Sequence, residues 1–146
     1  MNIFATLPNS IVQGNWHDSG TFDMLRNSLQ HTPGILSLVL LSNDGIVKAA
    51  YGIDVDDAQR ITAACSAMAS LSAHLSTGVD GGQVLHTVVT MQNRNVAVTA
   101  CGEGSTLFVA LEPSAPIGLA LGEIVRKARA YAEQMGTQSR ADLPAR

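Results

Sequence analysis

The sequence is poor in charged residues. Asp, Glu, Lys and Arg make up only 14% of the chain, against roughly 25% in an average globular protein. Little of the surface is therefore strongly solvated, and we expect another chain to bury part of it. The basic residues are scattered, with one small cluster at Arg126, Lys127 and Arg129. Without a basic stripe to follow a phosphate backbone, nucleic acid is not an expected partner.

Cysteine is also scarce. Cys65 and Cys101 lie in apolar runs and form neither a CxxC pair nor a metal-binding spacing with a histidine. We expect two buried, reduced thiols, as in a cytosolic protein. A nucleophilic Cys65 with His74 or His86 as base is disfavoured, because a thiol on the apolar stripe of a helix is inert. The histidines show no metal-binding spacing among themselves: His17, His31, His74 and His86.

Long uninterrupted apolar runs are absent. The segment from Ile61 to Val79 carries no charge, but serine, threonine and histidine interrupt it, so it suits close helix packing better than a bilayer. The segment from Met1 to Leu7 lacks basic residues and is too short for an export signal. We expect a cytoplasmic protein that would associate with a membrane only through its partners.

Groups of reactive residues are lacking as well. Asp54, Asp56 and Asp57 are not followed by glutamate or glycine at the spacing of a calcium loop, and acids suit the start of a helix without any metal. The GEGS segment at residues 102–105 lacks the lysine of a phosphate loop and joins two strands. We therefore expect no cofactor, no metal and no enzymatic activity.

Periodicity divides the chain into three parts. Residues 1–18 show no sustained period and are interpreted as a flexible arm that could dock through Phe4, Leu7 or Trp16. Residues 19–136 form one domain, and the polar residues 137–146 form a disordered tail. The elements predicted within the domain are a helix stopped by Pro33-Gly34, strands Ile35–Leu41 and Ile46–Tyr51, a helix over 54–77 ended by Gly78, strands Gln83–Met91, Val96–Cys101 and Ser105–Glu112, and a helix from Ile117 ended by Gly136.

This order predicts an α+β fold with a five-stranded, mainly antiparallel sheet. The first strand is apolar on both faces, so helices are expected on both sides of the sheet. One face of this strand carries Ile35, Val39 and Leu41, and the other carries Leu36, Leu38 and Leu40. The long helix also has two uncharged stripes and needs two packing partners. The first stripe consists of Ile61, Cys65, Met68, either Leu71 or Ser72, and Leu75. The second consists mostly of small residues: Ala63, Ala67, Ser70 and His74.

Several short motifs occur in this order: LSNDG at 41–45, DDA at 56–58, GEGS at 102–105 followed by Leu107, and IG at 117–118. In their order and spacing they resemble the Roadblock, or dynein light-chain, family, and especially its bacterial branch linked to small GTPases. The resemblance covers about Phe22 to Met135. It is strongest to the single-domain proteins of bacterial conservon systems, which it places beside a sensor-kinase-like protein and a small GTPase.

The resemblance implies a fold and a role. It places the first and last helices on one face of the sheet and the middle helix on the other, and it joins two chains through the middle helix and third strand. The dimer contacts expected from it are Ala63, Ala67, Ser70, His74, Val84, His86 and Val88. It further implies a non-enzymatic adaptor or regulator that binds a Ras-like GTPase, for which we select Asp57, Arg60 and Ala64 as contact residues. Lys48, a charge within the second strand, departs from the family pattern.

Two other interpretations stay open. A small-molecule sensory module of profilin-like or PAS-like kind needs a pocket with convergent polar groups. The strands offer only His86, Thr87 and Thr99 for this purpose. A thiol-dependent enzyme would need a Cys65 that reacts in the native state.

Overall fold

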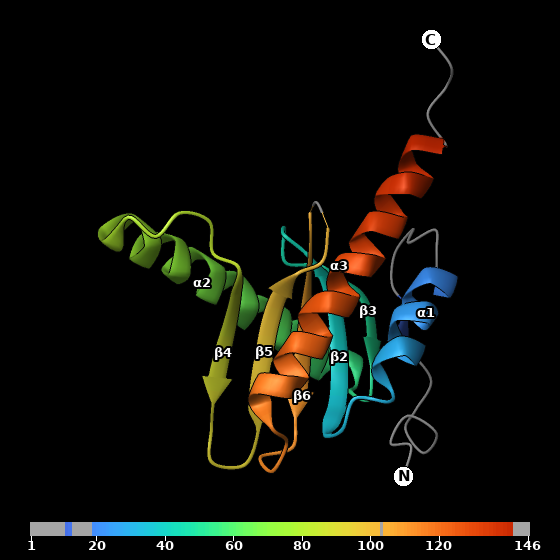
Figure 1. Ribbon diagram of the computed structural model, residues 1–146, viewed down its shortest axis with the longest axis horizontal. Helices are drawn as coiled ribbons and strands as arrows, with labels where there is room; N and C mark the ends of the chain where they lie inside the picture. Colours follow the sequence, from blue (N-terminus) through green and yellow to red (C-terminus); the bar gives the residue numbers. More distant parts are fainter. Residues whose placement is uncertain (1–10, 13–18, 103, 142–146) are drawn as a thin grey trace.

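The computed structural model describes residues 11–12, 19–102 and 104–141 of the chain. The elements in this part are β1 (Ile11–Val12), α1 (Ser19–Leu29), β2 (Ile35–Ser42), β3 (Val47–Tyr51), α2 (Val55–Val79), β4 (His86–Thr90), β5 (Asn95–Ala100), β6 (Ser105–Leu111) and α3 (Ile117–Ala141). All strand pairs are antiparallel, in the order β1-β3-β2-β6-β5-β4 (Figure 1). The predicted α+β fold and its five strands are confirmed, and β1 adds a short strand beside β3.

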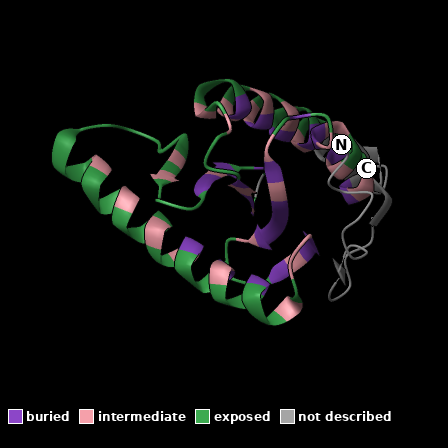
Figure 2. Cartoon of the chain, turned by 90° about the horizontal axis from the view of Figure 1, so that it is seen from below, coloured by how far each residue is buried: buried purple, intermediate pink, exposed green. Residues whose placement is uncertain are grey.

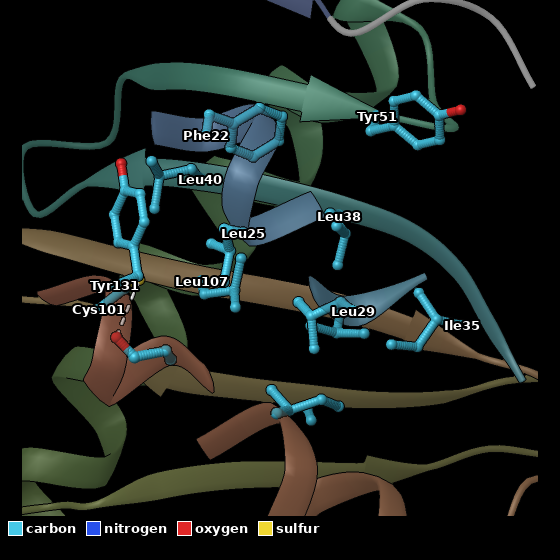
Figure 3. Close-up of a cluster of buried hydrophobic side chains, with 14 of the residues drawn as sticks. Phe22, Leu25, Leu29, Ile35, Leu38, Leu40, Tyr51, Cys101, Leu107 and Tyr131 are labelled. Carbon is cyan, nitrogen blue, oxygen red and sulfur yellow. Dashed lines mark hydrogen bonds between the residues drawn. The ribbon is translucent and has the colours of Figure 1, made fainter. Parts of the chain in front are cut away.

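The sheet lies between two hydrophobic cores. On one side α1 and α3 pack against the sheet, and Figure 3 shows side chains of this core, among them Phe22, Leu38 and Leu107. On the other side α2 packs on the sheet through a core that includes Val39 and Cys65. Because the strand β2 supplies Leu38 to one core and Val39 to the other, both faces of the sheet are covered, as predicted from its sequence.

One residue of β2 faces the other way from its predicted side. Ile35 was expected beside Val39 and Leu41, but it lies in the core that contains Leu38. The pairing of β2 with β6 shifts register between Ile35 and Ser37. Such a bulge inserts one extra residue and so reverses the alternation of side chains beyond it.

The edge of β3 is covered over part of its length. The strand β1 pairs there with Ala49 and Ala50. Nearer the start of β3, the register with β2 shifts at Lys48, as in a β-bulge. The Lys48 ammonium donates a 2.6 Å hydrogen bond to the hydroxyl of Ser105, and partial burial lowers the pKa of this lysine. The charge that departs from the family pattern is therefore turned across β2 toward the strand β6.

Both helix ends that were assigned to glycines lie elsewhere. α2 begins after Asp54, whose carboxylate accepts a 2.9 Å hydrogen bond from the Asp57 amide. It continues past Gly78 and ends at Asp80, which adopts the left-handed conformation with φ 55°. α3 likewise continues through Gly136 to Ala141. A helical glycine costs about 1 kcal/mol relative to alanine, which weakens a helix without ending it.

The predicted ends of the chain are only partly covered by the structure. The predicted tail, 137–146, is helical as far as Ala141. Residues 142–146 and most of the predicted arm lie outside the described residues, and so do the residues expected to anchor the arm: Phe4, Leu7 and Trp16. Within the arm, the structure describes only Ile11 and Val12, which form β1.

Candidate functional site

The helix α2 packs on the sheet along only part of its length. Ala58, Thr62 and Cys65 are buried, and Ile61 and Met68 pack against the same core. From residue 69 to residue 79, which we call the overhang, every residue is exposed or half-buried. Figures 1 and 2 show the overhang projecting beyond β4. A helix of 25 residues is about 37 Å long, whereas the six strands of the sheet, about 4.8 Å apart, span only about 24 Å.

The overhang corrects the predicted core stripe of the helix. The stripe expected to face the sheet included Leu75 and either Leu71 or Ser72. Leu71 and Leu75 are each 69% exposed, as is Val79, whereas Ser72 is half-buried. The stripe is completed instead by Thr62, which is fully buried and donates a 2.9 Å hydrogen bond to the Ala58 carbonyl. Thr62 lies four residues after Ala58 and three before Cys65, so its spacing could have revealed it. Because threonine carries a hydroxyl group, the sequence analysis did not count Thr62 among the apolar residues of the stripe.

All seven residues expected at a dimer interface are exposed. The overhang and the region of β4 form an outer groove of about 410 Å³, and Val84, His86 and Val88 line it together with Leu75 and Val79. The small-residue stripe does not line this groove. It consists of Ala63, Ala67, Ser70 and His74. The structure thus places the three predicted residues near β4 beside Leu75, which the sequence analysis had assigned to the core stripe, and beside Val79, which it had placed after the end of the helix.

The strand β4 has an uncovered edge. It pairs with β5 on one side, and no other described strand pairs with it. Its sequence, HTVVT, contains neither a charged residue nor a proline. It is also shorter than predicted, because residues 81–85 belong to the loop that returns from α2. An unpaired edge without such protection is a template for pairing with another strand.

The residues expected to contact a protein partner lie on the first part of α2. Asp57, Arg60 and Ala64 are all exposed. The Arg60 guanidinium lies 3.2 Å from the Asp57 carboxylate, with both side chains more than half exposed. An exposed pair of this kind contributes less than about 1 kcal/mol to stability. These residues are therefore available for binding at little cost to the fold.

The two thiols are poorly suited to catalysis. Burial raises the pKa of Cys65 to about 11 and that of Cys101 to about 12. Both thiols are therefore protonated at neutral pH, and a thiol is a poor nucleophile in that form. His31, His74 and His86 are exposed, while His17 lies outside the described residues. Among the described residues, no three His, Cys, Asp or Glu side chains form a group that could hold a metal.

None of the described helices combines the length and the hydropathy that a membrane-spanning segment requires.

Comparisons with known proteins agree with this geometry. A model of the Roadblock/LC7 domain matches residues 21–111, which is more than half of the chain. The crystal structure of a Roadblock/LC7 domain from Streptomyces avermitilis is 30% identical and superposes with a TM-score of 0.70, over 77% of this chain and 96% of that chain. None of the curated protein sequences that were compared matches the chain.

More distant structures share the fold. MglB from Myxococcus xanthus has a TM-score of 0.74 at 11% identity, over 83% of this chain and 99% of that chain. The gliding protein MglB from Thermus thermophilus has a TM-score of 0.65 at 16% identity, over 87% of this chain and 98% of that chain. The protein described here therefore belongs to the Roadblock/LC7 domain family.

Proposed function

We propose that this chain forms a homodimer through α2 and β4, and that the dimer binds a Ras-like small GTPase as a non-enzymatic adaptor or regulator in bacterial signalling. The observation that carries the proposal is the exposed apolar surface of the overhang and β4. The family resemblance supports the partner class, because it implies adaptors and regulators of small GTPases that donate no catalytic residue.

The dimer part of the proposal rests on apolar side chains that the single chain leaves in water. Those that would be buried are Leu71, Leu75, Val79, Val84 and Val88, which are between 37% and 69% exposed. Fully burying such a side chain contributes about 1.5–3 kcal/mol. The free energy gained by burying these side chains is therefore comparable to the cost of association, about 4–15 kcal/mol. Antiparallel pairing of two β4 edges about a two-fold axis would add backbone hydrogen bonds.

The GTPase part of the proposal concerns the outward side of α2. In a dimer joined through α2, the exposed Asp57, Arg60 and Ala64 of both chains would belong to one composite surface. A small apolar centre at Ala64 with charged groups around it has the form of many transient interfaces, in which a polar rim surrounds the contact. The low charge of the chain also favours protein contact over nucleic-acid contact.

The two parts are tested separately. Light scattering at micromolar concentration should give the mass of two chains, and a monomeric wild type would reject the dimer. The purified protein is then titrated with a Ras-like GTPase from the same cell, loaded with GDP and next with a GTP analogue. Binding is expected with at least one form. Its absence in both states up to about 100 μM, where contacts of about −5 to −6 kcal/mol are still detected, would reject the GTPase role.

A matched pair of variants locates the contact. Ala64→Glu should weaken GTPase binding about tenfold or more, because it introduces an unpaired charge into the contact. Ala130→Glu, at an exposed position of α3, should leave binding unchanged. The mass of each variant is measured alongside, so that a loss of GTPase binding is assigned to this surface only while the dimer persists. Equal binding by both variants would exclude Ala64 from the contact.

A further inference from the structure

A second, inner groove lies between the overhang and the sheet. Its volume is about 420 Å³. The helix α2 contributes Met68, Ser72 and Ser76 to its lining, and the strands contribute Thr87 and Val98. Figure 2 shows the chain leaving the far end of α2 and returning to β4 as a long loop. The groove is thus bounded by helix, loop and sheet of the same chain.

The groove exists because small residues face one another at this level of the helix. Nearer the start of α2, Ile61 and Cys65 belong to the core above the sheet. Further along, the helix contributes Ala69 and Ala73, and β5 contributes Ala100. Short side chains on both walls leave a space that dense packing would otherwise fill. The hollow is therefore a continuation of the α2 core without the side chains to close it.

Hydrogen bonds fix the loop that bounds the groove. The backbone amide of Asp80 donates to the Ser76 carbonyl, and the Ser76 hydroxyl donates to the carbonyl of Gly82. At the other end of the loop, the Thr99 hydroxyl donates to the Leu85 carbonyl at 3.4 Å. Collapse of the loop into the groove would break these bonds, and a hydrogen bond of this kind contributes about 0.5–1.5 kcal/mol. The groove is held open from both ends.

The lining combines apolar and hydroxyl groups and contains no Asp, Glu, Lys or Arg. It brings together His86, Thr87 and Thr99, the three polar strand residues that the sensory-module interpretation selected. A charged ligand would lose part of its hydration here without meeting the side chain of an Asp, Glu, Lys or Arg, which is unfavourable. The volume falls within the range of about 300–1,000 Å³ that is typical of small-ligand sites.

We propose that this inner groove binds an uncharged, partly apolar small molecule, a role beyond the binding of a protein partner. The hydroxyl-bearing residues Ser72 and Thr87 supply hydrogen-bonding capacity, while Met68 and Val98 supply apolar contact. Leu75 and Val79 line only the outer groove, and Met68 and Val98 line only the inner one. Val84 and His86, which are expected at the dimer contact, line both grooves, so a ligand in the inner groove would lie next to the second copy of the chain.

The test is an NMR titration of the full-length protein labelled on its methionine methyl groups. The neutral probes are 1-butanol, 1-hexanol and 1-octanol, and octanoate is the charged counterpart of octanol. The Met68 signal should shift, and affinity should rise about threefold to fourfold for each added CH₂ group. Octanoate should bind at least about tenfold more weakly than octanol. Met24, on α1 and 52% exposed, is the internal control.

Two responses in this titration would overturn the proposal. One is an equal response to octanol and octanoate. The other is a shift of the Met24 signal as large as that of Met68, since it would indicate binding to any exposed apolar surface.

Two variants place the binding site. Ala69→Leu extends a larger side chain into the groove and should weaken octanol binding about tenfold or more, whereas Ala130→Leu, on the exposed side of α3, should not change it. Equal octanol affinity of the two variants would show that the groove is not the site. Conversion of Ala69→Leu alone to a monomer would show that a second chain occupies the groove, and this result also overturns the proposal. The titration does not use a GTPase, so its outcome is independent of the GTPase role.

Discussion

The first part of α2, residues 55–68, and the overhang, residues 69–79, are both rich in small and apolar residues but have different surroundings. Both contain alanine, serine and a few large apolar residues, and neither contains a proline or an interior glycine before residue 78. Yet Ala58, Thr62 and Cys65 are buried, whereas Leu71 and Leu75 are mostly exposed. The helical period shows which residues share a face. It does not show how far the sheet extends beneath that face.

The largest expected effect comes from placing a charge on the overhang. Leu75→Glu should weaken dimerisation more than about 100-fold, because burying an unpaired carboxylate costs several kcal/mol. The free energy of unfolding of the single chain should stay nearly constant, since the side chain is already 69% exposed there. Leu119→Glu is the matched control, because Leu119 is 75% exposed on α3. Sedimentation over a concentration series measures both, and equal dissociation of the two variants would contradict the proposed interface.

A change in the first part of the helix should lower the free energy of unfolding, which the change on the overhang leaves nearly constant. Ala58→Leu forces a larger side chain against the sheet at a fully buried position, so it should lower the free energy of unfolding by about 1–3 kcal/mol. Ala73→Leu, on the overhang, should change it by less than about 0.5 kcal/mol. Chemical denaturation of both variants is the measurement. A similar loss in both would show that the overhang packs as tightly as the first part.

Alkaline pH should also distinguish the two parts, through Cys65. Burial raises the folded-state pKa of this thiol from 9.0 to about 11. Its contribution to stability is therefore fully present below pH 9 and is lost as pH rises toward 11, because the unfolded chain releases its proton first. Between pH 8 and pH 10 the loss should be about 1 kcal/mol. Denaturation of wild type and Cys65→Ala at both pH values tests this, and the variant should lose less; parallel losses would show that Cys65 has no part in the effect.

The smallest expected effect concerns the exposed pair at the start of the helix. Arg60→Ala removes the contact with Asp57 and should lower the free energy of unfolding by at most about 0.5 kcal/mol, because exposed pairs three residues apart contribute little. Thermal melts at low and high salt measure it. A loss above about 1 kcal/mol that persists in high salt would place Arg60 in the packed part of the fold rather than on a surface available for a partner.

Much of the fold could be predicted because each signal was local. The SNDG turn after β2 and the unbroken apolar run of that strand fixed the first hairpin and the need for helices on both faces. The errors arose where distant parts of the chain decide the outcome. Ile35 changes face because β6 pairs with a bulge, and Leu75 is exposed because the sheet ends before α2 does. Asp80, not Gly78, ends the helix.

The candidate site was predictable in kind and less so in detail. The absence of charge from 61 to 79 indicated that α2 has a second contact surface, and the residues selected for it are all exposed. The outer groove, however, is lined by Leu75 and Val79 and not by the small-residue stripe. Periodicity could not show which of the two groups of residues lines the groove, because it does not indicate where α2 extends beyond its own sheet.

The two rims of the sheet set a limit on growth by strand addition. The β3 rim already carries β1 along Ala49 and Ala50 and has an irregularity at Lys48, features that discourage a further strand. Among the described strands, the outermost one at this end is β1, which is only two residues long, whereas β4 at the other end offers an unpaired edge of five residues. If two chains join through β4, the doubled sheet ends at a short β1 on either side. Because two residues offer few backbone groups for pairing, growth beyond the pair by strand addition would be disfavoured.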